Sequence, residues 1–157
     1  MKKTILLLLI FSLTLFGANQ IKEGSSLNVL NGFKYETPTG RQMKIPKKSQ
    51  LIIVAFEKDT GKLVNKYLNT KEQFYLVKRH GIYIADINKM PSIITNMFAL
   101  PKLRKYKHLI YLHFDEEFQT IVPHHEEEIT IIRVDNQKIT DISFVKTTQE
   151  LQAAIEK

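Results

Sequence analysis

The sequence predicts an α/β domain in which helices flank a mixed β-sheet that begins with a β-hairpin. Three apolar runs rich in β-branched and aromatic residues, at 51–56, 82–87 and 109–114, have the length and composition of buried strands. Helical patterns of apolar residues separate these runs, and short alternating stretches flank them. Interleaved strands and helices favour crossover connections and helices on both faces of one sheet.

The chain before the first central strand is expected to be largely extended. Residues 27–30 suggest one short strand. Residues 33–36 and 42–45 alternate apolar and polar side chains, and Thr37–Gly40 between them has the proline and glycine of a tight turn. This pattern predicts the N-terminal β-hairpin.

The first central strand, 51–56, leads into a polar loop and then into a helix with an apolar face at 63–68. Thr70 and Gln73 have the spacing of a capping box, which would restart or bend that helix. Gly81 is expected to end it in a left-handed conformation.

The second half continues the alternation. Pro91 suits the first position of the next helix, and Pro101 should break or kink that helix. Strands at 129–134 and 139–144 form a second hairpin, and a capping box at 147–150 opens a final helix. The apolar face of the helix after Pro91 consists of Ile93, Ile94, Met97 and Phe98.

Residues 1–18 have the pattern of a secretory signal peptide, with a basic start, an apolar run at 5–16 and expected cleavage after Ala18. The run is shorter than the roughly 20 residues that span a bilayer. Phe16 is large for its place in the cleavage site, which leaves an uncleaved anchor as the alternative. The mature chain, 19–157, would be a single periplasmic or secreted domain with no membrane span.

Composition excludes some functions. The mature chain has 21 basic and 16 acidic residues, which leaves a charge of +5 and favours an anionic surface or an envelope protein over nucleic acid. There is no cysteine, which excludes disulfides, thiol exchange and thiolate catalysis.

The polar loop after the first central strand is the main candidate site, because chemistry in α/β domains often lies there. The segment differs from aspartate-nucleophile phosphotransfer loops, since Glu57 stands at the nucleophile position, and it lacks the upstream glycine of a P-loop. A plain helix cap from Asp59 or Thr60 explains the same residues without a function. The candidate binding residues here are Glu57, Lys58, Asp59, Thr60 and Lys62.

Two further clusters carry possible chemistry. His124, His125 and Glu126 are competent metal ligands, although adjacent histidines on an extended segment point to opposite faces. A solvated acidic connection is the alternative. His108 and His113, at the two ends of the third central strand, are expected to be edge or loop histidines. A basic run could meet phosphate or acidic lipid, or be a solvated face. Its candidate binding residues are Lys102, Arg104 and Lys105.

The order of elements resembles the thioredoxin-like fold, in particular its secreted, peroxiredoxin-like branch. There a glycine-led loop and a hairpin precede the first central strand, as Gly24 and residues 33–45 do here. In that family the redox cysteines would fall at 59–64, and this chain has none. The resemblance implies a concave loop edge built from residues 57–62, with Pro123 and His124 opposite.

The chain also resembles small exported bacterial proteins that share the strand–EKDTG–helix arrangement and the segment Met97–Lys102. Those proteins carry automatic labels such as FAD/FMN-containing dehydrogenase. A flavin finds no support in the residues, because no glycine fingerprint follows a strand.

These observations favour a non-catalytic binding or scaffold module of the cell envelope without redox cysteines. The alternative is a divergent enzyme, either a flavin-dependent oxidoreductase or a metal-assisted hydrolase that uses His124 and His125. The sequence identifies no cofactor.

Overall fold

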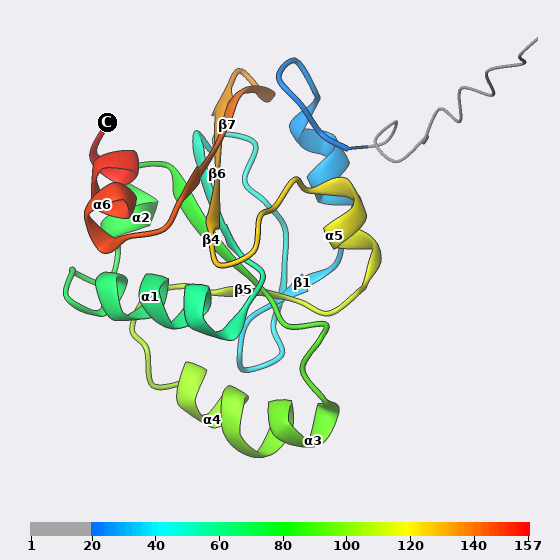
Figure 1. Cartoon of the computed structure of the whole chain (residues 1–157), viewed down its shortest axis with the longest axis vertical. Coiled ribbons are helices and arrows are strands. Elements are labelled where there is room, and N and C mark those ends of the chain that lie inside the picture. Colours follow the sequence, from blue (N-terminus) through cyan, green and yellow to red (C-terminus); the bar gives the residue numbers. More distant parts are fainter. Residues whose placement is uncertain (1–19) are drawn as a thin grey trace, which may run out of the picture.

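The computed structural model describes residues 20–157, so the predicted signal peptide lies outside the described residues. A seven-stranded mixed sheet forms the centre of the domain (Figure 1). The strands are β1 (Tyr35–Glu36), β2 (Gln42–Met43), β3 (Leu51–Ala55), β4 (Gly81–Asp86), β5 (Tyr111–His113), β6 (Ile129–Asp135) and β7 (Lys138–Val145).

The strand order across the sheet is β2-β1-β5-β4-β3-β6-β7. The three central strands, β3, β4 and β5, run parallel, and all other neighbours pair antiparallel. Their carboxyl ends therefore meet at one edge of the sheet, and the loops that follow β3 and β4 lie next to each other.

Helices cover both faces of the sheet. They are the 3₁₀ helix η1 (Leu27–Gly32), α1 (Lys58–Asn69), α2 (Tyr75–Lys78), α3 (Ser92–Ile94), the π-helical turn η2 (Thr95–Ala99), α4 (Leu100–Leu103), α5 (Glu117–Ile121) and α6 (Thr148–Glu156). Among residues 20–157, no helix is both long and apolar enough to cross a bilayer.

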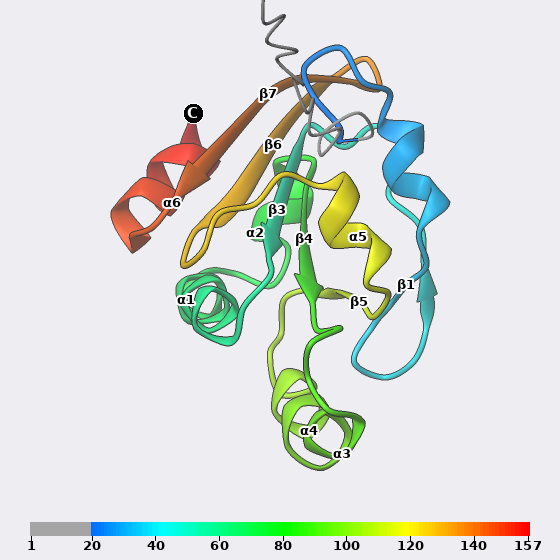
Figure 2. The same ribbon diagram turned by 45° about the vertical axis from the view of Figure 1, so that its right-hand side comes forward.

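Successive residues of the central strands contribute to two separate cores. In β3, Ile52 and Val54 pack with η1 and α5, while Leu51 and Ile53 pack with α1, α2 and α6. This alternation follows from the two-residue period of a strand, and all five residues of β3 are buried because both faces are covered. Figure 2 shows α5 and η1 on one side of the sheet and α1 and α6 on the other.

The predicted α/β class, the three central strands and both hairpins are confirmed. The last capping box is also present: Glu150 N–H donates to Thr147 Oγ1 at 3.2 Å, and the Glu150 carboxylate accepts from Thr147 N–H at 3.0 Å. Asn136 and Gln137 turn the second hairpin with φ values of 47° and 64°, so the turn between β6 and β7 is left-handed at both central positions.

Three local predictions are wrong, and one helix was missed. Residues 27–30 belong to the 3₁₀ helix η1, which Ser26 caps by accepting from Asn28 N–H. Thr70 caps the end of α1 rather than starting a helix, because its hydroxyl donates to Tyr67 O at 2.7 Å. His80, with φ 52°, takes the left-handed position that was expected at Gly81, and Gly81 opens β4. Helix α5 was not predicted.

Pro101 does not interrupt its helix. The Leu100 N–H bonds Thr95 O, five residues back, so the preceding turn is wide. A proline ring in a regular helix meets the carbonyl four residues before it. The wide turn therefore relieves that contact, and η2 and α4 continue as one segment at the end of the molecule below the sheet (Figures 1 and 2).

Candidate functional site

The loop after β3 is held by its own polar groups. Thr60 Oγ1 accepts from Glu57 N–H at 3.2 Å and donates to Glu57 O at 3.0 Å. The sequence offered Asp59 or Thr60 as the cap of α1, and the structure shows that it is Thr60. Asp59 is exposed in the first turn of the helix. These contacts fix the direction in which α1 leaves the sheet.

The loop that contains residues 123–128 lies against the same strand end. The Glu57 carboxylate accepts from Glu127 N–H at 3.2 Å, and the His124 ring lies 4.6 Å from the Phe56 ring between centroids. The two segments that the sequence singled out are therefore adjacent. The Glu57 carboxylate therefore holds the two segments together.

A cavity of about 530 Å³ opens beside this contact. One wall comes from the ends of β3 and β4 and the first two turns of α1, and the other comes from residues 87–106. Of the residues predicted for the site, Glu57, Lys58, Lys62 and Lys102 line the cavity. Asp59, Thr60, Arg104 and Lys105 do not, and neither do Pro123 and His124, so the opposite wall differs from the one expected.

The wall that the sequence did not reveal is largely apolar. Its side chains include Met90, Ile94, Phe98, Leu103 and Tyr106. The sequence places Ile94 and Phe98 on one helix face but does not show what that face meets. Ile94 and Phe98 remain 44% and 63% exposed, so no element within residues 20–157 fully covers them.

Buried polar groups lie at the base of the cavity. Asn65 Nδ2 donates to Gly61 O at 2.8 Å, and Asn65 Oδ1 accepts from His108 Nε2 at 2.9 Å. Tyr83, also fully buried, donates to Gly61 O at 3.4 Å. Burial raises the pKa of Tyr83, so its hydroxyl stays protonated at physiological pH.

His108 lies in the loop before β5, as the prediction of an edge or loop histidine allows, and it has a structural role. Its side chain is buried, and burial together with Lys107 lowers its pKa to about 4. Because Nε2 carries the proton, Nδ1 has a free lone pair, and it is buried without a hydrogen-bond partner. His113 is likewise buried, and its Nδ1 donates to Lys34 O at 3.0 Å.

Asp86 is, with Glu57, one of the two acidic groups that line the cavity. Its carboxylate accepts from Asn88 N–H at 3.2 Å, Asn88 Nδ2 at 2.9 Å and Gln119 Nε2 at 3.1 Å. Burial raises its pKa, and these donors act in the opposite direction. Like Glu57, this carboxylate is already bound by the protein.

The three candidate residues of the basic run, Lys102, Arg104 and Lys105, have different positions and contacts. Lys102 lines the cavity. Arg104 Nε donates to Pro38 O at 2.8 Å and so ties α4 to the turn of the N-terminal hairpin. Lys105 is exposed outside the cavity.

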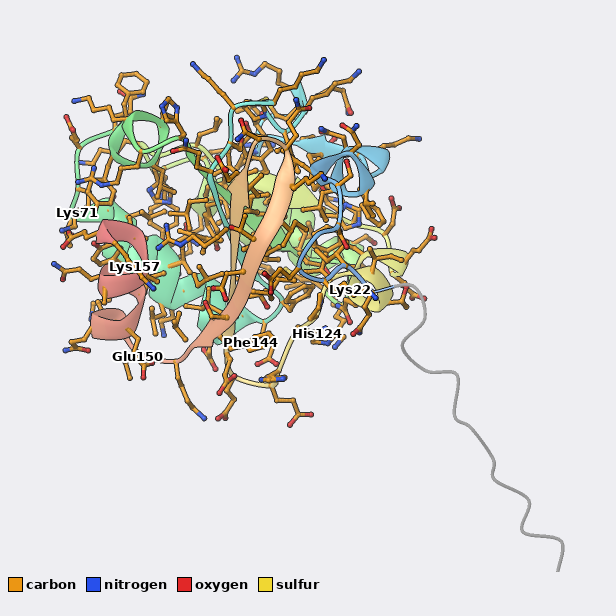
Figure 3. All side chains as sticks on the ribbon, turned by 90° about the horizontal axis from the view of Figure 1, so that it is seen from above. Lys22, Lys71, His124, Phe144, Glu150 and Lys157 are labelled. Atoms are coloured by element: carbon orange, nitrogen blue, oxygen red, sulfur yellow. The ribbon has the colours of Figure 1, made fainter. Side chains whose placement is uncertain are left out.

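The predicted metal ligands do not gather. His125 Nδ1 lies 2.9 Å from Glu128 Oε2, and its ring stacks on Phe144 at 3.9 Å. His124 instead packs on Phe56, and Glu126 is exposed. Figure 3 shows His124 and Phe144 at the same edge of the molecule. Within residues 20–157, no group of three or more histidine, aspartate or glutamate side chains could hold a metal ion.

Comparison with known proteins places the fold. No family model and no curated protein matches the chain. Among solved structures, peroxiredoxin Q of Xanthomonas campestris matches with a TM-score of 0.53 and 13% identity, over 87% of this chain and 95% of that one. A putative protein disulfide isomerase of Bacteroides thetaiotaomicron matches with a TM-score of 0.51 and 12% identity, over 86% and 84%.

A SCO1/SenC family lipoprotein of Bacillus anthracis matches with a TM-score of 0.50 and 8% identity, over 79% of this chain and 90% of that one. At these identities the likeness concerns the fold alone. The mixed sheet flanked by helices is therefore thioredoxin-like, and this chain builds it without cysteine.

Proposed function

We propose that the chain is an exported binding module of the cell envelope, which uses the cavity beside the β3–α1 loop to hold a ligand and performs no redox chemistry. The cavity carries this proposal. Its volume of about 530 Å³ is that of a small-molecule site, and its lining is mainly apolar with a few polar groups. The absence of cysteine removes thiol chemistry from the same edge.

The neutral dye Nile red should bind saturably to protein purified from the envelope fraction, with a rise in fluorescence. Ala99→Trp should weaken this binding at least about tenfold, because the indole fills space that a ligand would occupy. Asn96→Trp is the matched control, since Asn96 is exposed on the same segment and does not line the cavity. Fluorescence titration measures both.

The intact mass of the same preparation reports whether residues 1–18 have been removed. If Ala99→Trp and Asn96→Trp bind the dye equally well, or if the parent protein does not bind it, the cavity is not the binding site. Absorbance of a bound flavin in the visible range would overturn the non-catalytic part of the proposal.

The partner favoured for the module is an anionic surface. Residues 87–107 contain five basic residues and no acidic residue, while Ile93 and Met97 are 68% and 65% exposed. Cationic segments with exposed apolar side chains bind anionic lipid surfaces. An envelope protein is the other partner that the charge allows.

Vesicles that contain anionic lipid should therefore sediment the protein at low salt, and purely zwitterionic vesicles should not. Met97→Asp should weaken this binding at least about fivefold, because it removes an apolar contact and adds repulsion. Val29→Asp is the control, since Val29 is 43% exposed on η1, outside that segment. An equal loss of vesicle binding in Met97→Asp and Val29→Asp would point to an envelope protein as the partner instead. Equal binding to anionic and zwitterionic vesicles would do the same.

A further inference from the structure

We infer that the cavity takes an amphiphilic anion, a molecule with an apolar chain or ring system and one carboxylate or phosphate group. This inference rests on the proposed binding role and names the ligand class for the same site. It follows from the separation of apolar and basic groups around the cavity.

The apolar part of the ligand is specified by residues 87–106. Ile94 and Phe98 line the cavity and are still 44% and 63% exposed, so their surfaces lose contact with water only when something else covers them. Phe56, Ala85 and Leu103 continue this apolar surface. A polar ligand would leave these side chains in water, whereas an alkyl chain or ring would bury them.

The negative charge of the ligand is inferred from the lysines that line the cavity. Four lysines line the cavity: Lys58, Lys62, Lys89 and Lys102. Among residues 20–157, none of them lies within salt-bridge distance of a carboxylate. Lys58 is the first residue of α1, where the helix dipole also favours a negative group, and Lys62 follows about one turn later. The basic groups of this cavity therefore remain available for an anion.

The two acidic groups of the cavity do not cancel this field. The Glu57 carboxylate accepts from the backbone of Glu127, and the Asp86 carboxylate accepts from Asn88 and Gln119. These donors are neutral, so each carboxylate keeps its negative charge and the hydrogen bonds hold it in place. Four lysines against two carboxylates still leave the rim positively charged beside an apolar interior.

The test uses the mature protein and four ligands with one common tail: dodecanoate, dodecyl phosphate, dodecanol and dodecylammonium. The three ionic ligands are kept below their micelle concentrations, and dodecanol is kept below its solubility limit. Displacement of Nile red reports binding. The two anions should bind about tenfold more tightly than the alcohol, and the ammonium compound more weakly than the alcohol. A preference between the two anions tells a fatty-acid-like ligand from a phosphate-bearing one.

Lys62→Glu should remove the preference for the anions over the alcohol and leave affinity for the alcohol within about twofold. Lys66→Glu is the matched control, since it makes the same charge change one turn later on α1 at a residue that does not line the cavity. Thermal unfolding of both variants checks that each is folded.

The outcomes separate the two proposals. Equal affinity for all four ligands, or an unchanged preference in Lys62→Glu, would overturn the ligand class and leave the binding role standing. If neither Nile red nor any of the four ligands binds, the binding role itself fails.

Discussion

Phe118→Ala should destabilise the domain by about 3–5 kcal/mol, the usual cost of removing a fully buried aromatic ring. Phe118 is 0% exposed and lies at the centre of the core between the sheet and α5. Its ring contacts Phe33 at 5.1 Å, Tyr35 at 6.2 Å and His113 at 4.5 Å between centroids. Total stabilities of about 5–15 kcal/mol are usual, so most of the stability could be lost. Urea unfolding followed by circular dichroism measures the change.

Phe114→Ala is the matched control for that substitution. Phe114 is four residues away in the same stretch of chain but is 39% exposed. Its removal should cost less than about 1 kcal/mol, because surface substitutions rarely cost more. Similar losses in the two variants would show that α5 does not pack on the sheet as described.

Acid should destabilise the domain through His108. Its pKa is about 4 in the folded protein against 6.5 in an unfolded chain, so the unfolded chain binds the proton first as the pH falls. The stability that the neutral ring provides is complete above pH 6.5 and declines between pH 6.5 and 4. The expected loss is about 2–3 kcal/mol by pH 4. Chemical unfolding at a series of pH values measures it.

His108→Gln should flatten this part of the stability curve, since the amide keeps a donor for Asn65 and does not titrate. His124→Gln is the matched control: it makes the same substitution at a histidine that packs on Phe56, and the decline attributed to His108 should remain in this variant. Asp86 acts in the opposite direction: its raised pKa makes the folded state gain stability as the carboxylate takes up a proton. A curve that does not change in His108→Gln would contradict the assignment.

The central strands could be predicted because burial on both faces requires runs of apolar residues. Residues 51–56 are apolar throughout, and residues 82–87 are apolar except for Asp86. The capping box formed by Thr147 and Glu150 could also be predicted, because its contacts join residues that are close in the sequence. Helix α5 could not: it has five residues, and only Phe118 among them is buried, so no helical period can appear. Residues 27–30 offered a strand-like composition, but contacts elsewhere in the fold decide their conformation.

One wall of the candidate site could be predicted from the sequence and the other could not. Its α1 wall could be predicted, because loops after buried strands lie at the carboxyl edge of the sheet, and Lys58 and Lys62 do line the cavity. Its second wall could not. The spacing of Ile94 and Phe98 shows that they share a helix face, but it does not show whether that face meets the core or a cavity. Asn65 and Tyr83 carry no sequence signal that separates them from ordinary core residues.

The orientation of the side chains in the second wall depends on the number of residues in the wide turn η2. Each residue of a helix turns it by about 100°, so removing one residue within Thr95–Ala99 would rotate everything on one side of the deletion against the other. Ile94 would then be rotated relative to Leu103 within the same wall of the cavity, although the composition of the segment would barely change. Relatives of this chain that lack that one residue would have the same fold and a different binding surface.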